Sequence, residues 1–305
     1  MARNYEIGSG SRCAFGNQST WGTPASPSSL LPMRSESIVV SSTKSAEETL
    51  VASKTQNEAS LESIRVNGGI SMWLRPSIVD PLFTMALGKK SNGKYILAEP
   101  DDDVKFCTIA MERGSQLAKY SNVACSSLTI SADAQKTVGI ELQLLGWKEE
   151  NLTSFPSLTA VTEKSFKCTN ASCTIDGGSE LPIETMSISI NNNLIEGPVT
   201  YLTGMFIGES AYGQRAVTAS FTLPFGAEYK NIASNLTTDS DIELHLEFDN
   251  GQGYGIEIDI PHLSINSANG NVGGSGLIDG SISGTALSVG TDEPIEITYT
   301  TPTTV

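Results

Sequence analysis

The sequence predicts a mainly β protein with two tandem antiparallel β-sandwich or barrel modules, each flanked by one α-helix. The first observation behind this fold class is an internal similarity between residues 70–130 and residues 219–265. The second is the alternation of apolar and polar residues in short segments of both regions, which is typical of half-buried strands. The third is the abundance of Gly, Ser, Thr and Asn, which suits strands joined by many turns. A repeat this long indicates a duplicated domain, because solenoid repeats are much shorter.

The internal similarity requires two registers. A shift of 149 residues superposes apolar positions of a strand and a helix, namely Ile70/Ala219, Met72/Phe221, Leu74/Leu223, Phe83/Ile232 and Leu87/Leu236. A shift of 135 residues superposes later strands, namely Cys107/Ile242, Ile109/Leu244, Met111/Leu246, Val123/Ile258, Cys125/Ile260, Leu128/Leu263 and Ile130/Ile265. The difference, 149 − 135 = 14 residues, is an insertion in the first copy, most simply the polar stretch at residues 91–103. Two similar modules favour a building block for a ring or array, because each can present an equivalent surface.

Length and charge limit the classes of function. The chain of 305 residues has room for two domains that each bury a core. Nineteen basic and 34 acidic side chains give a formal net charge of −15. This balance excludes a general nucleic-acid binder, which would need a basic face to neutralise phosphates. The charge either serves solubility or belongs to a surface that a polyanion passes without binding, and composition does not separate the two.

The sequence predicts no membrane span, metal site or cofactor. No run of 18 apolar residues exists, and the N-terminus lacks the apolar core of a secretory signal. Cys107 and Cys125 occupy apolar strand positions and are expected to be buried and reduced. Cys168 and Cys173 are compatible with half of a zinc site or with a disulfide. However, the chain has no second cysteine pair of this kind, and its histidines lie far away along the sequence.

The first part of the chain divides into an arm and a domain. Residues 1–35 are predicted to form an irregular N-terminal arm, because several prolines lie among small residues there. The first domain is expected at residues 36–148. Its predicted elements are a strand at 37–40, a polar loop at 41–63, a strand at 70–75, a helix at 78–87 and strands at 107–113, 122–130 and 137–145. Gly88 is expected to stop the helix, and Pro81 to lie near its first turn, where proline is tolerated.

The second part repeats this order. Residues 149–185 lack clear periodicity and are predicted to be a linker, and residues 186–305 form the second domain with a Thr- and Pro-rich tail. The predicted elements are a strand at 186–190, a polar loop at 191–213, a strand at 217–223, a helix at 226–236 and strands at 242–248, 255–265, 277–286 and 295–299. A helix on one side of a small antiparallel sandwich satisfies this order, since the sheet must bury its apolar face. Such open sandwiches leave sheet edges that are either blunted or used for assembly.

Several segments, taken in order, carry a family resemblance. They are Gly16, Trp21-Gly22-Thr23-Pro24-Ala25, Leu31-Pro32, Ser35-Glu36-Ser37-Ile38, residues 68–76, 78–88 and 256–261, Ser264-Ile265 and residues 272–282. In these segments the sequence resembles the tail tube proteins (major tail proteins) of long-tailed bacteriophages, of the type with a duplicated tube domain. The resemblance extends over most of the chain and is weakest at residues 91–103 and 149–182.

The resemblance implies a self-assembling structural virion protein and not an enzyme. In this family each tail-tube-like unit is a β-sandwich with a flanking helix, inner sheets of neighbours join into a barrel around a DNA channel, and rings stack along the tail. Six such domains usually close one ring, so two domains per chain imply homotrimeric, pseudo-hexameric rings stacked helically. The acidic charge would then give a negative lumen that lets genome DNA slide through without specific binding.

The same resemblance implies further partners, a location and contact residues. The partners are the initiator or tip, terminator and tape-measure proteins of the tail, and the location is the virion, after synthesis in the host cytoplasm. The loops at 41–63 and 191–213 would reach a neighbouring subunit or ring, or else only cover the surface. The predicted inter-subunit contacts are Trp21, Glu36, Glu47, Glu48, Arg65, Tyr201, Phe206, Tyr212 and Arg215. Trp21 suits an anchor on a neighbour, and the alternative is that it folds onto its own domain.

Two other classes of function compete with this interpretation. An enzyme is disfavoured, since no nucleophile elbow, phosphate loop or dinucleotide motif precedes a helix, although His262 lies near Asp259 and Ser264. Glu257 and Asp259 share one face of a strand, which is more typical of a solvated or channel-facing stripe than of a glycosidase pair. The alternative is a duplicated β-sandwich that binds carbohydrate or a cell surface. Aromatic residues are only 7% of the chain and do not cluster, which counts against it.

Overall fold

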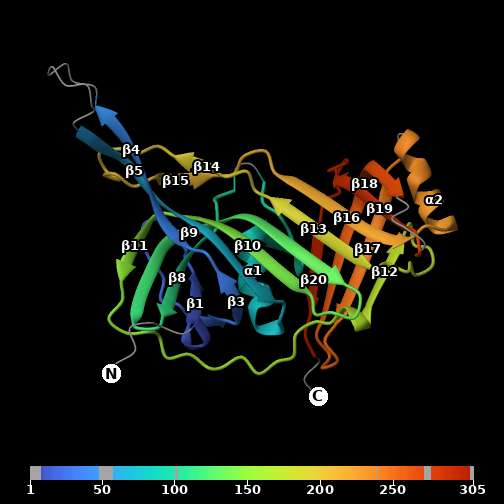
Figure 1. Ribbon diagram of the computed structural model, residues 1–305, viewed down its shortest axis with the longest axis horizontal. Coiled ribbons are helices and arrows are strands. Elements are labelled where there is room, and N and C mark those ends of the chain that lie inside the picture. Colours follow the sequence, from blue (N-terminus) through green and yellow to red (C-terminus); the bar gives the residue numbers. More distant parts are fainter. Residues whose placement is uncertain (1–7, 48–57, 100–101, 239, 271–275, 303–305) are drawn as a thin grey trace.

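The computed structural model describes residues 8–47, 58–99, 102–238, 240–270 and 276–302. The described residues are mainly β with two α-helices, α1 (Pro76–Leu87) and α2 (Ala227–Ser234), so the predicted mainly β class is confirmed. Figure 1 shows two β-rich halves side by side, with α1 near the middle and α2 at the far end of the second half. We call residues 8–151 the first half and residues 168–302 the second half.

The strands of the two halves follow a similar order. The first half has β1 (Arg12–Asn17), β2 (Ser29–Leu31), β3 (Met33–Glu36), β4 (Val39–Glu47), β5 (Glu58–Trp73), β6 (Gly88–Ser91), β7 (Lys94–Leu97), β8 (Phe106–Arg113), β9 (Gln116–Asp133), β10 (Gly139–Gly146) and β11 (Lys148–Asn151). The second half has β12 (Ala171–Ile175), β13 (Thr185–Asn191), β14 (Ile195–Gly197), β15 (Gly208–Ala211), β16 (Ala216–Pro224), β17 (Ile242–Asp249), β18 (Gly255–Gly270), β19 (Asp279–Ala286) and β20 (Glu296–Thr300). The series β5, α1, β8, β9, β10 matches the series β16, α2, β17, β18, β19.

One antiparallel sheet runs through both halves. Its strands lie in the order β5, β10, β9, β13, β16, β19 and β18, and we call it the central sheet. The halves meet where β9 pairs with β13, with Ile130 opposite Ile188 and Leu128 opposite Ile190. These four side chains are buried on the same side of the sheet, so the alternation that defines each strand also fixes this register.

The long strands β9 and β18 each belong to two layers. The N-terminal part of β9 pairs with β8 and β11, and β1 and β2 continue that outer layer of the first half. The N-terminal part of β18 pairs with β17 and β20, which are flanked by β12 on one side and by β7 and β6 on the other. Each half is therefore a sandwich with its core between an outer layer and the central sheet. Tyr120 and Phe221 are among the largest buried side chains of the two cores.

Helix α1 forms where the sequence analysis places a helix. It begins at Pro76, whose fixed φ suits the first turn, and ends at Gly88, which has a φ of 92° in the left-handed region that favours glycine. Most of its apolar side chains are buried, including Ile78, Leu82 and Phe83. The helix begins two residues earlier than the predicted residue 78, so Pro81, expected near the first turn, lies in its interior.

The region predicted as an irregular arm contains paired strands. In β1 the side chains of Cys13, Ala14 and Phe15 are buried, and β1 pairs with β8 on one side and β2 on the other. β3 pairs with β5. The irregular-arm prediction is therefore wrong for these segments. A continuous apolar run of three residues carries no alternation, so periodicity does not distinguish it from a loop.

Both regions predicted as polar loops contain hairpins. β4 pairs with β5 from Val39 opposite Asn67 to Glu47 opposite Glu58, and β14 pairs with β15. Figure 1 shows the β4–β5 hairpin projecting from the body, with β14 and β15 beside it. Residues that face solvent on both sides of a strand show no apolar alternation, which explains why these strands were not predicted.

The insertion and the linker also contribute strands. β7 lies within the polar insertion at residues 91–103 and pairs with β20, so Tyr95 lies opposite Ile297 of the second half. β12 lies within the linker region and pairs with β17, with Cys173 opposite Leu246. β7 therefore ties the two halves together, and β12 extends the outer layer of the second half. The irregular sequences of these segments did not indicate either pairing.

Candidate assembly surfaces

The join between the halves is closed by a half-buried arginine, Arg215, from the second half. The Nε of Arg215 donates to Asn192 Oδ1 at 2.9 Å, and its other nitrogens donate to the carbonyls of Ala86, Leu87 and Ala98 at 3.2, 2.9 and 3.2 Å. The side-chain amide of Asn192 also donates to Ala86 O at 2.9 Å. The last carbonyls of a helix have no partner within it, and a cation is favourable there. Arg215 and Asn192 therefore cap α1 from across the join.

Burial lowers the pKa of Arg215, but the guanidinium stays charged at neutral pH, because its ordinary pKa lies far above 7. The ring of Tyr212 lies 4.1 Å from the Arg215 guanidinium carbon and faces it. Tyr212 also lies against Gly88, where an added Cβ would be 2.8 Å from its hydroxyl oxygen. The glycine that ends α1 therefore also makes room for a side chain of the second half.

A row of aromatic rings crosses the same join. Trp21 lies 4.9 Å from Phe106 and 5.9 Å from Trp147, measured between ring centroids, and Trp147 lies 5.9 Å from Phe206 of the second half. Leu194 and Tyr212 pack against the same cluster. The segment between β13 and β16 is thus held against the first half by aromatic packing.

That segment and the β4–β5 hairpin form one projection, which we call the finger (residues 39–47, 58–66 and 194–212). The backbone N–H of Ile64 in β5 donates to Met205 O at 2.6 Å, and the N–H of Ile207 donates to Ile64 O at 3.3 Å. Arg65 forms an exposed ion pair with Glu196. The finger is therefore built from both halves of the chain.

The finger carries unusually exposed apolar side chains. Tyr201 and Leu202 are fully exposed, and Ile195, Val199 and Met205 are also exposed. Exposed apolar groups scattered singly are ordinary, but several within one short segment mark an interaction surface. The segment of the finger at residues 195–205, from β14 into the turn before β15, therefore has the composition of a contact site.

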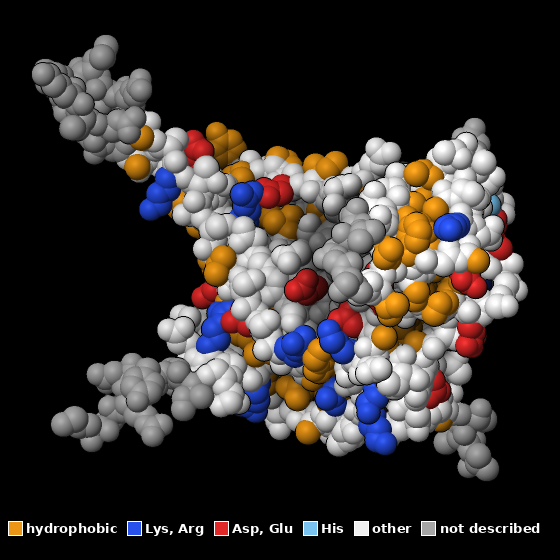
Figure 2. Space-filling model, turned by 45° about the vertical axis from the view of Figure 1, so that its right-hand side comes forward, with side chains coloured by type: hydrophobic (Ala, Val, Ile, Leu, Met, Phe, Trp, Pro, Cys, Tyr) orange, Lys and Arg blue, Asp and Glu red, His pale blue; other side chains and the backbone are white. Residues whose placement is uncertain are grey.

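The central sheet ends in an edge on each side. Within the described residues, β4 pairs with β5 alone, and the part of β18 from Ser264 to Gly270 pairs with β19 alone. Val39 and Val40 are exposed at the first edge. Beside the second edge, α2 buries only Tyr229 and Ile232, and Phe225, Leu236 and Leu277 are exposed. Figure 2 shows hydrophobic side chains gathered on the surface of this part of the molecule.

A sheet with an edge at each end and a projecting apolar finger is the form of a subunit that assembles. The sequence matches, over residues 8–286, the family described as phage tail tube protein. The chain belongs to this family. The tail tube protein is therefore a structural component of the phage virion. A comparison of the sequence with curated proteins finds no match. No helix in the described part of the chain is long and apolar enough to cross a membrane.

The predicted contact residues of the tail tube protein have different surroundings. Trp21 packs on Phe106 and Trp147 of its own half, which is the alternative expected for it from the sequence. Contacts across the join between the two halves are made by Phe206, Tyr212, Arg215 and Arg65. Glu36 pairs with Arg113 within the first half, and Tyr201 is exposed in the turn between β14 and β15. Glu47 ends β4, and Glu48 lies outside the described residues. Contact with another chain stays a prediction for all of them, and sequence reasoning missed Asn192, whose asparagine-rich surroundings gave no sign of a cap.

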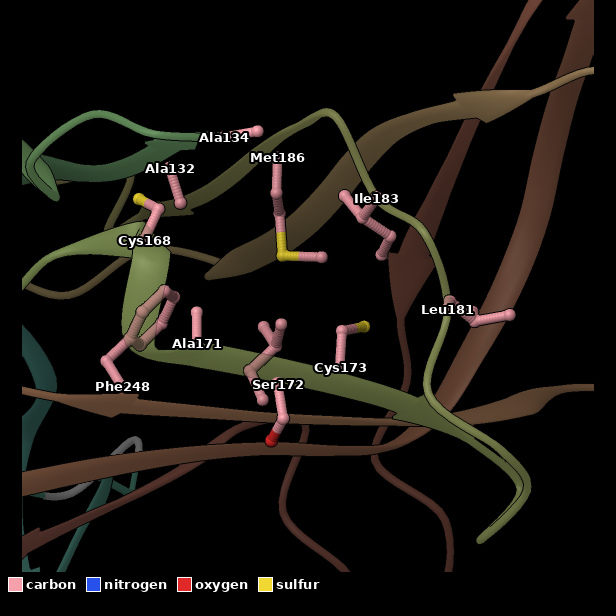
Figure 3. Close-up of a pocket in the computed structure, with 11 residues that line it drawn as sticks. Ala132, Ala134, Cys168, Ala171, Ser172, Cys173, Leu181, Ile183, Met186 and Phe248 are labelled. Atoms are coloured by element: carbon pink, nitrogen blue, oxygen red, sulfur yellow. The ribbon is translucent and has the colours of Figure 1, made fainter.

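The cysteines of the linker region line a small apolar pocket. Its volume is about 90 Å³, and it lies between β12, β13, β17 and the end of β9. Figure 3 shows Met186 pointing into it from β13, opposite Ala171 and Cys173 of β12. Cys168 and Cys173 are free thiols here, and burial raises the pKa of both, that of Cys173 to about 12. A protonated thiol is a poor nucleophile and a poor metal ligand.

The histidines lie on the outer layer of the second half. His245 contacts Asp259 and Glu247, and its hydrogen bond to Asp259 raises the pKa of the imidazole. His262 contacts Asp292 at 3.2 Å, not Asp259 or Ser264 as its sequence neighbours would suggest. In the described residues, no group of three or more His, Cys, Asp or Glu side chains is arranged to hold a metal ion.

Proposed function

We propose that this tail tube protein assembles into closed rings that stack helically into the tube, and that genome DNA is delivered through the channel. The observation that carries the proposal is the central sheet, which continues through both halves and has an edge at each end. Open sheet edges pair with another chain unless they are blunted or covered. A head-to-tail contact generates a ring when its rotation closes, and closure pairs every edge.

The join inside the chain supplies a pattern for the join between chains. We infer that the halves are duplicated tube domains, at residues 36–148 and 186–305, with the arm at 1–35 and the linker at 149–185. In the first half, β9 has β13 as its neighbour in the sheet. The strand at the place of β9 in the second half is β18, which forms an edge there. The strands that match β13 in the first half are β3 and the start of β4, because they flank β5 as β13 flanks β16. Residues 264–270 of one chain would therefore pair with β3 and β4 of the next.

Three chains would supply six halves and so form a homotrimeric, pseudo-hexameric ring. The finger is proposed to contact a neighbouring ring through Tyr201 and Leu202. Family membership supports further contacts with initiator or tip, terminator and tape-measure proteins of the tail, and synthesis in the host cytoplasm. It also supports a role without catalysis. The net charge of −15 supports passage of DNA without specific binding.

Negative-stain electron microscopy of the purified protein at several concentrations, with mass photometry beside it, tests the proposal. Hollow tubes or three-chain rings are expected. Rings of six chains would keep the tube but contradict the trimer. A protein that stays monomeric at every concentration and also in the presence of preformed tail tips would contradict self-assembly and favour the carbohydrate-binding or adhesive module.

Two variants separate ring closure from stacking. Leu277→Asp places a charge beside the β18 edge, and rings are expected to be lost. Leu202→Asp places a charge in the exposed β14–β15 turn of the finger, so single rings are expected to form without stacking into tubes. Both side chains are exposed in the single chain, so neither change should unfold it. Thr159→Asp, at an exposed position away from both surfaces, is the matched control and should assemble normally.

A further inference from the structure

The outward face of the central sheet is covered by hydroxyl side chains. Across β9, β13, β16, β19 and β18, one cross-strand row consists of Thr129, Ser189, Thr218, Thr285 and Ser264. The next row consists of Ser131, Ser187, Ser220, Ser283 and Ser267. The residues between them point into the core, except for Asn266, which is exposed at an irregularity in the pairing of β18 with β19. We call these two rows the hydroxyl face.

The hydroxyl face is a coherent surface. Ser267 and Ser283 lie 2.8 Å apart between hydroxyl oxygens, and the amide of Asn266 donates to Thr285 Oγ1 at 2.7 Å. Beyond the second of these rows, the hydroxyl oxygens of Thr185 and Thr222 lie 2.7 Å apart. Short side chains that bond to one another across strands make a flat, polar surface with few groups that extend into solvent.

Charge lies on other surfaces. On the outer layer of the second half, Glu247 lies opposite Glu257, and Asp259 lies opposite Glu296. By contrast, the rows of the hydroxyl face carry no charged residue among β9, β13, β16, β19 and β18. Their continuation onto β10 adds Glu141, Asp133 ends the outward series of β9, and Asp279 begins the outward series of β19. The acidity of the chain is therefore not concentrated on the hydroxyl face.

We propose that the hydroxyl face is the wall of the channel, so that DNA passes over an uncharged, hydrated surface and not over an acidic one. This inference rests on the proposed ring. If the central sheets of neighbouring chains join edge to edge, one face of the resulting barrel carries the cores and outer layers of every half. That face cannot border a channel, because it is filled by packed side chains. The other face, which carries the rows, borders it.

The chemistry of the wall fits a polyanion in transit. Binding of DNA is driven largely by counterion release when Lys or Arg neutralises phosphates, and the rows offer no such group. Repulsion by carboxylates is also weak there. Hydroxyls keep a layer of water along the wall, so phosphates move past it without a strong contact in either direction. We therefore expect retention of DNA by the tube to be low at every salt concentration.

Thiol labelling tests which face borders the channel. Ser220→Cys places a thiol in the middle of the hydroxyl face, and Thr298→Cys places the matched control on the outer layer. Assembled tubes are first verified by electron microscopy and then treated with a maleimide carried by a folded protein wider than the channel. Wild-type tubes give the background from the native cysteines.

We expect the Ser220→Cys thiol to be labelled in the single chain but protected in tubes. The Thr298→Cys thiol should be labelled both in the single chain and in tubes. Labelling of Ser220→Cys in intact tubes would overturn the inference and leave the tube itself standing. Absence of wild-type tubes, also in the presence of preformed tail tips, would overturn the proposed function, and this inference with it.

A charge variant tests the neutrality of the wall. Ser220→Lys tubes are expected to retain short duplex DNA at low salt and to lose it at high salt. Wild-type tubes and Thr298→Lys tubes are expected to retain little at either concentration. Equal retention by the Ser220→Lys and Thr298→Lys tubes would contradict the assignment of the wall.

Discussion

The two helices occupy matching places in the two halves but have different surroundings. α1 lies at the join within the chain, where Arg215 and Asn192 bind its last carbonyls and its apolar side chains are buried. α2 lies at the open end, buries only Tyr229 and Ile232, and has no such cap from a second half. The difference shows what a neighbouring half supplies. The second half caps and covers the helix of the first half. Within the described residues of a single chain, no third unit caps or covers α2 in the same way.

The largest expected contrast lies between two leucines near these helices. Leu82 in α1 is 1% exposed, and Leu236 after α2 is 42% exposed. Leu82→Ala should lower the free energy of unfolding by about 2–5 kcal/mol, because it leaves a cavity. Leu236→Ala should lower it by less than about 1 kcal/mol in the single chain. Urea unfolding measures both values, and equal losses would remove the contrast between the helices.

The cap on α1 provides the next contrast. Arg215→Ala leaves the buried carbonyls of Ala86 and Leu87 without the guanidinium, and we expect a loss of about 3 kcal/mol. Arg65→Ala removes only an exposed ion pair with Glu196 and should cost less than about 1 kcal/mol. Both values come from the same urea experiment. A loss at Arg215 no larger than that at Arg65 would show that the cap does not hold the halves together.

An ion pair near the first open edge is expected to have an intermediate effect. Arg113 donates to both carboxylate oxygens of Glu36 at 2.8 and 2.7 Å, and this contact lowers the pKa of Glu36. Glu36→Gln should lower the free energy of unfolding by about 1–2 kcal/mol at neutral pH. A depressed pKa stabilises the fold above the carboxyl's unfolded pKa, near 4.3, and the gain is lost as pH falls through the folded pKa. The difference between wild type and variant should therefore disappear in acid.

The smallest expected effect is at His245 on the outer layer. Its pKa is raised by Asp259, so the contribution is fully present below the unfolded pKa, near 6.5, and is lost as pH rises through the folded value. The pair is partly exposed, so the gain should be below about 1 kcal/mol. Comparing wild type with His245→Gln from mildly acidic to alkaline pH measures it. A difference that grows with pH would contradict the sign.

Much of the fold follows from local pattern, and much of the assembly surface does not. The alternation at Val217, Ala219 and Phe221 predicts β16, and Gly88 predicts the end of α1. The pairing of β7 with β20 joins residues about two hundred apart in sequence, and no local pattern encodes such a contact. The finger strands have solvent on both sides, so they lack the apolar stripe by which strands are recognised.

The candidate contact residues show the same limit. Phe206 and Arg215 were selected as residues that suit an interface, and each lies at one, but it is the join between the halves of one chain. Trp21 packs instead on aromatic rings of its own half. Sequence indicates that an aromatic or a cation will be buried against a partner, and it does not indicate whether the partner belongs to the same chain. The hydroxyl face had a visible signal, because Ser and Thr alternate with apolar residues in β13, β16 and β19. Its meaning depended on knowing that these strands are neighbours.

The β9–β13 pairing has a kinetic consequence for a ring built from such chains. In such a ring, joins within a chain alternate with joins between chains. Each join within a chain is already formed before any two chains meet, because the covalent link holds its two sides at a high effective concentration. Only the joins between chains depend on a diffusive encounter, and only they cost translational and rotational freedom. A ring of this kind has half as many contacts between chains as a ring of separate domains, so fewer incomplete rings should accumulate during assembly.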